Sequence, residues 1–428
     1  MHGFSYKNGS LYCEDVELAE LAVEHGTPLY VYSAETILGH YRRLDAALVG
    51  VDHEVAYAVK ANSNLSVLRL LAQEGAGFDI VSGGELFRVV KAGGDPARCT
   101  FAGVGKTRAE IVYALQQGIY SFNVESGEEL RYLNQVAGEL GVTAPVAVRV
   151  NPNIDAHTHK YISTGKSENK FGVDFEAIPG LYDQAAELPY IRLRGLQMHI
   201  GSQLTSIKPF IEAVEKVAPL ARLLQDRHGI EFWSIGGGIG IVYQDSLASG
   251  GADWWQAQPE EGGQLTIERY GMELVPRLKD CGLKILLEPG RLIVGNAGVL
   301  LTRCLYEKKG TAKTFKIVDA GMNDLIRPAL YEGHHEIVPL KQPAADARIT
   351  VDVVGPICES GDFFCQNREL PDFQPGDFIA LMSAGAYGFA MASNYNSRPL
   401  PAEILVHGSK AAVIRKRQTL EDVISGEE

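Results

Sequence analysis

Short runs of β-branched and aromatic residues alternate with long helical patterns from residue 54 onward. Helical segments such as 64–74, 83–92 and 207–228 separate the runs. Eight runs within roughly 235 residues match a (β/α)8 TIM barrel in count and size. A doubly wound open sheet shows the same alternation, and counting strands alone does not exclude that architecture. The runs are 54–59, 78–81, 99–102, 120–124, 145–150, 193–199, 231–236 and 284–288.

The pattern changes after about residue 297 and predicts a second domain. Strand-like runs follow without a long amphipathic helix, and residues 1–34 also contain strand patterns. We therefore predict an α/β chain with a barrel over 35–296. A mostly β domain, a sandwich or barrel, would form from 297–428 and recruit 1–34. The later runs are 299–306, 314–318, 349–354, 377–382 and 403–406.

One long segment, 244–265, interrupts the barrel pattern. It contains no lysine or arginine, several glycines and two adjacent tryptophans. Loops of this length in compact domains are usually functional or disordered. We interpret it as a surface insertion on the barrel rim.

Charge and cysteine content narrow the classes of partner. The net charge of −13 disfavours nucleic acid and anionic membranes, and no apolar stretch is long enough to span a bilayer. The first residues show no signal-peptide pattern. The six cysteines form no C-x-x-C pair, which predicts a reducing compartment, the cytoplasm. Two histidine pairs, 157 with 159 and 334 with 335, lack further ligands at metal-binding spacing, so we expect no metal.

Two polar residues follow predicted barrel strands, where barrel active sites lie. Lys60 follows the first run and is flanked by apolar and small residues. Partial burial would lower its pKa and suit Schiff-base chemistry, although a lysine can also simply reach solvent from a strand end. His199 ends the sixth run, and a lone histidine is more often a core residue than a catalytic one.

Glycine and acidic residues follow the last two strands. Gly236, Gly237 and Gly238 would let backbone N–H groups approach a phosphate, or form only a tight turn. They do not form the G-x-G-x-x-G dinucleotide pattern. Glu288 precedes Pro289-Gly290-Arg291 and could pair with that arginine. With a lysine and a phosphate site nearby, it could instead keep the ring nitrogen of pyridoxal phosphate protonated.

Eight motifs in order resemble the fold-type III pyridoxal-phosphate decarboxylases, most of all the branch that acts on diaminopimelate. The resemblance covers nearly the whole chain. One departure is Val242, where a proline is expected nearby. The motifs are YAVKAN at 57–62, FDIVSGGE at 78–85, HIGSQ at 199–203, GGG at 236–238, EPGR at 288–291, MNDLIRPALY at 322–331, CESGD at 358–362 and GAYG at 385–388.

The resemblance implies how pyridoxal 5'-phosphate would be bound. Lys60 would form the Schiff base, with Asp79 beneath it. His199 would stack on the ring and Glu288 would contact the pyridine nitrogen. The phosphate would be held by Ser202, Gly236, Gly237, Gly238, Gly290 and Arg291, and by Tyr387 of the other subunit.

The resemblance also implies a substrate and a reaction. Arginine presents a fork that fits carboxylates, and Arg327 would bind the far carboxylate of the substrate. Without the resemblance, a salt bridge within the β domain is the simpler interpretation of Arg327. Glu359 would bind the far amine, and Cys358 would protonate the carbanion. The implied reaction converts meso-2,6-diaminopimelate to L-lysine and carbon dioxide, the last step of lysine biosynthesis. The remaining substrate contacts would be Arg291, Tyr331 and Tyr387.

A homodimer with shared active sites follows from the same resemblance, because Cys358 and Glu359 would come from the neighbouring subunit. Three alternatives stay open. The chain could act on another acidic or conjugated amino acid, or could be a racemase, although that branch favours arginine at the ring nitrogen. It could also be a binding protein without activity, which the intact Lys60, Glu288 and Cys358 disfavour.

Overall fold

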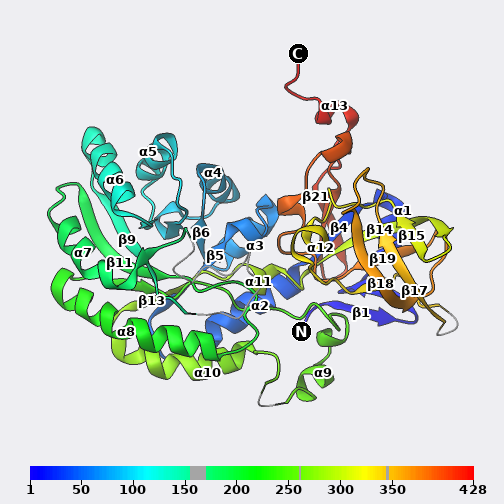
Figure 1. Cartoon of the computed structure of the whole chain (residues 1–428), viewed down its shortest axis with the longest axis horizontal. Helices are drawn as coiled ribbons and strands as arrows, with labels where there is room; N and C mark the ends of the chain where they lie inside the picture. Colours follow the sequence, from blue (N-terminus) through cyan, green and yellow to red (C-terminus); the bar gives the residue numbers. More distant parts are fainter. Residues whose placement is uncertain (155–169, 260–261, 344–346) are drawn as a thin grey trace. The chain divides into compact units, whose positions relative to one another are not determined.

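The computed structural model describes residues 1–154, 170–259, 262–343 and 347–428. The chain divides into two compact units (Figure 1). The barrel unit comprises Leu38–Gly240 and Glu260–Leu292, and the β unit comprises Met1–Ile37, Ile241–Pro259 and Ile293–Glu428.

The barrel unit contains a closed ring of parallel strands. β8 pairs with both β7 and β9, and β13 pairs with β5, so the ring has no free edge. This closure confirms the TIM barrel over the doubly wound open sheet, which would have two edges. A short strand, β10 (Val173–Asp174), adds to β9 outside the ring. The ring strands are β5 (His53–Ala58), β6 (Gly77–Ile80), β7 (Cys99–Phe101), β8 (Ser121–Val124), β9 (Ala144–Asn151), β11 (Ile191–Met198), β12 (Phe232–Ser234) and β13 (Lys284–Leu287).

Five of the barrel helices, α3, α4, α5, α6 and α10, begin at side-chain caps, and several barrel helices end at glycine. Ser82 and Ser126 accept backbone N–H bonds at the starts of α4 and α6, and Thr107 forms a capping box with Glu110 at α5. These caps explain why α4, α5 and α6 begin soon after the strands that precede them. The helices are α2 (Ala34–Ala47), α3 (Leu65–Gln73), α4 (Gly83–Ala92), α5 (Arg108–Gln117), α6 (Gly127–Leu140), α7 (Ile178–Ala186), α8 (Lys208–His228) and α10 (Ile267–Leu278).

The β unit is organised around β14 (Gly298–Lys309) and β4 (Leu29–Ser33). β4 pairs antiparallel with β14 and parallel with β20 (Ala402–His407). The prediction that N-terminal strands join the C-terminal sheet is therefore confirmed. The other predicted strands are β15 (Thr314–Val318), β17 (Arg348–Val354) and β19 (Phe378–Leu381). A separate small sheet contains β1 (Phe4–Lys7), β2 (Ser10–Cys13) and β3 (Val16–Glu17).

Some elements of the β unit escaped prediction. β18 (Phe363–Pro371) contains polar residues that break its apolar pattern, and β21 (Lys410–Arg415) is largely exposed. β16 (Ile337–Pro339) has only three residues. Helix α1 (Leu18–His25) lies within the N-terminal region that we expected to contain strands.

Residues 244–259 of the tryptophan-containing segment belong to the β unit, so the prediction that this stretch is an insertion of the barrel was wrong. The Ser246 and Ser383 hydroxyls are 2.5 Å apart, and the Leu247 N–H donates to Glu336 at 2.7 Å. The segment includes the short helix α9 (Ala252–Gln256), and the Trp255 indole donates to the Ser249 carbonyl. Its partners lie far along the sequence, so residue spacing could not indicate this location.

Candidate active site

Lys60 and Asp79 lie together at the carboxyl ends of neighbouring strands. β5 ends at Ala58, and a 3-10 turn over Val59–Ala61 presents the lysine. Its Nζ donates to Asp79 Oδ2 on β6 at 2.7 Å. The Asp79 side chain is 1% exposed, whereas that of Lys60 is 40% exposed and so less buried than we expected. The lysine therefore presents a primary amine anchored by a buried carboxylate.

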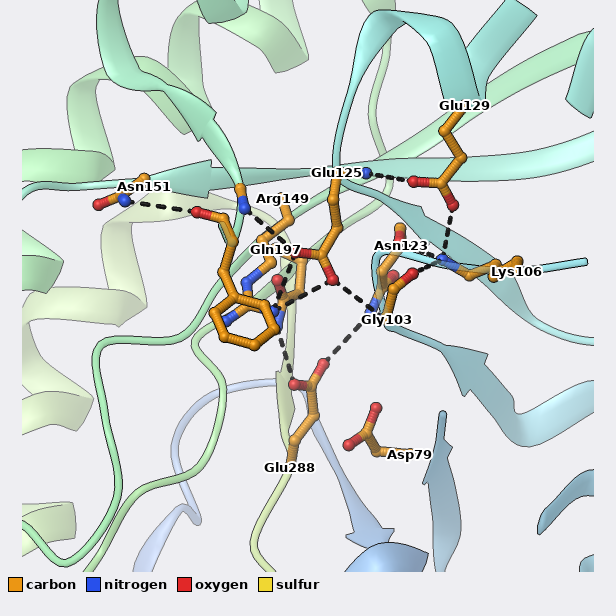
Figure 2. A network of polar contacts seen from close by, with 12 residues as sticks. Asp79, Gly103, Lys106, Asn123, Glu125, Glu129, Arg149, Asn151, Gln197 and Glu288 are labelled. Atoms are coloured by element: carbon orange, nitrogen blue, oxygen red, sulfur yellow. Dashed lines mark hydrogen bonds and ion pairs between the residues drawn. The ribbon is translucent and has the colours of Figure 1, made fainter. Parts of the chain in front are cut away.

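Glu288 is buried at the end of β13 and receives hydrogen bonds from three strands. Ser234 Oγ donates to Oε1 at 2.7 Å. Gln197 Nε2 donates to Oε2 at 2.9 Å, and Asn123 Nδ2 lies 3.5 Å from Oε1 (Figure 2). Burial, and then the negative charge of Asp79, raise the pKa of Glu288 to about 7, against the opposing effect of its donors. Near neutral pH this side chain can therefore hold or release a proton.

Asn123, Gln197 and Ser234 are further residues of the candidate site that the sequence interpretation missed. Asn123 Oδ1 and Gln197 Oε1 are buried and have no hydrogen-bond partner among the described residues. A signal was present, since Asn123 and Gln197 are polar residues within apolar stretches of β8 and β11. A polar side chain on the inward face of a buried strand requires a partner, and that partner is Glu288.

His199 follows β11 and lies against the glycine run. The Gly237 N–H donates to His199 Nδ1 at 3.3 Å, so this nitrogen is unprotonated. Burial, with the positive charges of Arg149 and Lys60, lowers the His199 pKa well below its usual value. The imidazole is therefore neutral, which suits stacking on an aromatic ring.

The glycine run is required by close backbone contacts. A Cβ on Gly237 would lie 2.2 Å from the Glu288 carbonyl oxygen. Gly236 and Gly238 have positive φ angles of 75° and 101°. Larger residues would therefore displace the segment that carries Glu288.

Arg291 and Ser202 lie together on the same side of the barrel unit. Arg291 begins the short helix α11 (Arg291–Val294), and its Nη2 donates to Ser202 Oγ at 3.0 Å. A Cβ on Gly290 would lie 2.9 Å from the Ala61 Cβ, so this segment packs on the lysine turn. A cation and a hydroxyl at these positions can bind an anion such as phosphate.

A second layer of buried charged side chains supports the strand ends around Glu288 (Figure 2). Arg149 Nη1 lies 3.2 Å from both oxygens of Glu125, which also accepts the N–H groups of Gly103 and Gly172. Lys106 Nζ donates to Glu129, and to the carbonyls of Gly103 and Asn123. These bonds fix the backbone beside Asn123, one of the donors to Glu288.

Glu85 is a further titratable group near the lysine that received no role from the sequence. It lies in the first turn of α4 and accepts the Val81 N–H at 2.7 Å. Burial raises its pKa to about 7, while the Lys60 charge opposes this change. Its position within the FDIVSGGE motif was the available signal.

The remaining predicted residues form a second group, in the β unit. Arg327 begins helix α12 (Arg327–Tyr331) and is buried, and Tyr331 ends it. Cys358 and Glu359 are exposed on one loop, and Tyr387 has a left-handed φ of 56°.

Asp362 anchors the loop that carries the exposed cysteine. Its two oxygens accept the N–H groups of Met322 and Ile357, each at 2.6 Å. The Cys358 N–H donates to Asn396 Oδ1 at 2.9 Å. The exposed side chains of Cys358 and Glu359 therefore belong to a loop whose backbone is held by these hydrogen bonds.

The described ranges lack two features, a membrane-spanning helix and a metal-binding group. No helix there combines the length and apolar character needed to cross a membrane. No three histidine, cysteine or acidic side chains gather there as a metal-binding group. His157 and His159 lie outside the described residues.

The barrel matches a known class of enzyme domain. Residues 34–295 match the family described as "Pyridoxal-dependent decarboxylase, pyridoxal binding domain". Because the match covers more than half of the chain, the fold and the site define a pyridoxal-dependent decarboxylase.

Relatives that match along the full chain indicate which kind of pyridoxal-dependent decarboxylase this is. A diaminopimelate decarboxylase of Pseudomonas aeruginosa is 49% identical, with 100% of this chain and 99% of that protein covered. One from Vibrio cholerae is 48% identical, with 98% and 97% covered. The structure of Helicobacter pylori diaminopimelate decarboxylase complexed with L-lysine has 42% identity and a TM-score of 0.87, with 95% and 98% covered. The chain belongs to the diaminopimelate decarboxylase family.

Proposed function

We propose that this chain decarboxylates meso-2,6-diaminopimelate to L-lysine and carbon dioxide, the last step of lysine biosynthesis. One observation carries the proposal. Lys60, Asp79 and Glu288 lie together at one end of the barrel. The chain that forms this barrel is similar over its full length to diaminopimelate decarboxylases.

The described residues of the barrel unit fit pyridoxal phosphate. Asp79 Oδ1, Asn123 Oδ1 and Gln197 Oε1 are buried without a hydrogen-bond partner among these residues, as expected around a polar group. Lys60 would hold the cofactor covalently, His199 would stack on its ring and Glu288 would contact its ring nitrogen. When bound, the cofactor accepts the electron pair that the departing carbon dioxide leaves behind. Its phosphate would lie among Ser202, Gly236, Gly237, Gly238, Gly290 and Arg291, with Tyr387 of the other subunit.

Two residues of the chain would supply protons in the proposed reaction. Glu288 would give its proton to the ring nitrogen, and its carboxylate would then be held by Ser234, Gln197 and Asn123. Asp79, which accepts a hydrogen bond from Lys60, would stabilise the lysine ammonium once the substrate amine has taken the place of Lys60. Cys358 of the neighbouring subunit would give its thiol proton to the carbon that has lost its carboxylate.

The proposed substrate contacts match its charges. Arg327 would bind the far carboxylate, with Arg291, Tyr331 and Tyr387 completing the set of substrate contacts. Glu359 would accept a hydrogen bond from the far amine. A substrate that carries both a carboxylate and an amine at its far end fits Arg327 and Glu359 better than ornithine, which carries only an amine there.

The proposal includes the cellular compartment and the type of ligand. The six cysteines are free, which fits a reducing compartment such as the cytoplasm. The net charge of −13 favours a small-molecule enzyme over a nucleic-acid binder.

A panel of amino acids tests the proposed reaction. Release of carbon dioxide would be measured from meso-diaminopimelate, ornithine, lysine and arginine, with pyridoxal phosphate present. We expect release from diaminopimelate alone. If none of the four were turned over while the cofactor still bound, the substrate assignment would be wrong, and other acidic or conjugated amino acids would be tested next.

Mixing two inactive variants tests the proposed homodimer with shared sites. Cys358→Ala and Lys60→Ala should each be inactive alone. After subunit exchange, half of the dimers would be mixed and would contain one intact site, so about a quarter of wild-type activity should return. A mixture that stays inactive, with exchange shown by tagged subunits, would mean that each chain builds its own site.

A further inference from the structure

The Arg327 side chain is held by two neighbours that have no role so far. Arg327 is 6% exposed at the start of α12. Its Nη1 lies 2.8 Å from His335 Nε2, and its Cζ lies 4.4 Å from the centre of the Tyr243 ring. One neighbour therefore forms a hydrogen bond with the guanidinium, and the guanidinium lies over the ring of the other.

The hydrogen bonds of His335 determine its protonation. Its Nδ1 lies 2.8 Å from the Met382 carbonyl oxygen, which can only accept, so Nδ1 carries the proton. Nε2 is then an acceptor for the Arg327 N–H. Burial and the Arg327 charge lower the His335 pKa well below its usual value, so the ring is neutral.

His335 is fixed at its backbone as well as at its ring. Its carbonyl oxygen accepts a hydrogen bond from Arg368 Nη1 at 2.6 Å, and the next residue, Glu336, accepts the Met382 N–H at 2.9 Å. The Tyr243 ring packs edge-on against the imidazole at 5.4 Å between centroids. Arg327, His335 and Tyr243 thus form one packed group, which we call the arginine clamp.

Both supports of the clamp are uncharged. An acidic support would hold the guanidinium but would also compete with an incoming carboxylate for its charge. A neutral imidazole acceptor and an aromatic ring orient the guanidinium and bring no negative charge of their own beside it. This arrangement suits an arginine that must bind an anion from solution.

We infer that His335 and Tyr243 are positioning residues that orient Arg327 for the second carboxylate of the substrate and thereby set specificity. The inference rests on the proposed function, in which Arg327 binds that carboxylate. Neither residue is expected to contact the reacting carbon, so both should affect binding more than turnover.

Two inhibitors that differ by one carboxylate test the clamp. L-lysine, the product, retains the far carboxylate, whereas 1,5-diaminopentane lacks it. In His335→Leu, which removes the acceptor, the KM for meso-diaminopimelate and the Ki for L-lysine should rise about 10- to 50-fold. The kcat and the Ki for 1,5-diaminopentane should stay within about twofold, and His335→Gln, which keeps an acceptor, should partly restore L-lysine binding.

Variants of Tyr243 provide an independent comparison. Tyr243→Phe keeps the aromatic face and should bind L-lysine as the wild type does, while Tyr243→Leu should weaken its binding. If a thermal melt shows that His335→Leu does not fold, the two Tyr243 variants test the clamp in its place.

The outcomes separate the two proposals. Wild-type protein without activity on diaminopimelate would overturn the proposed function and this inference with it. An active wild type, whose His335 and Tyr243 variants lose affinity for both inhibitors equally or for neither, would overturn the clamp alone.

Discussion

Replacing Lys60 by alanine or arginine should lower kcat for diaminopimelate by at least about 10⁴-fold, because both changes remove a covalent catalytic group. Arginine keeps the positive charge that pairs with Asp79 at 2.7 Å in the wild type, but its guanidinium cannot replace the primary amine. Comparing the two variants therefore separates the amine from its charge. Carbon dioxide release and the absorbance of the protein mixed with pyridoxal phosphate provide the measurements.

The matched control is Lys91→Ala, which removes an exposed lysine on α4. It should keep full activity and the wild-type absorbance spectrum. Substantial activity in Lys60→Arg would show that the chemistry needs only a cation at this position, and would remove Lys60 from its proposed role.

Glu288→Gln should lower kcat by about 10²- to 10³-fold, the usual effect of removing one preorganised electrostatic contact. The amide has nearly the same shape but cannot provide the proton that the ring nitrogen needs. The change should therefore affect kcat much more than cofactor affinity. Ser234→Ala, which removes one donor to Glu288, should have a smaller effect in the same direction. Equal kcat values for Glu288→Gln and the wild type would contradict the proposed proton transfer.

The same variant gives a pH dependence in the cofactor-free protein. The folded state raises the Glu288 pKa from 4.5 to about 7, so it favours the protonated carboxyl. The wild type should therefore lose stability relative to Glu288→Gln as the pH rises from about 4.5 to about 7, and the difference should level off above that range. Urea unfolding of both proteins across this range measures the effect. Glu85 has a similarly raised pKa, but it is present in both proteins and cancels in the comparison.

The barrel and the ends of its strands could be predicted because most ring strands are short apolar runs that alternate with helical segments. Lys60 and Glu288 stood out as charged residues directly after such runs. The donors to Glu288 did not stand out, because a single amide within an apolar strand gives little indication of its partner. Asn123 and Glu288 are 165 residues apart, and only the closure of the barrel brings them together.

The β unit was harder to predict for related reasons. Segment 241–259 follows a barrel strand directly, but it packs against residues near 336 and 383. The arginine clamp also depends on such distant contacts, since Tyr243 lies 84 positions before Arg327 in the sequence. Neither contact leaves a periodic pattern that a single sequence could reveal.

The pairing of β4 has a consequence for the order of synthesis. β4 ends at Ser33, but it is flanked by β14 and by β20, which ends at His407. While the chain is being made, the barrel strands are complete by Leu287, whereas one edge of β4 stays without its partner until Ala402–His407 have left the ribosome. An open strand edge can pair with other chains. Until β20 emerges, the open edge of β4 is therefore an aggregation-prone site of the nascent β unit.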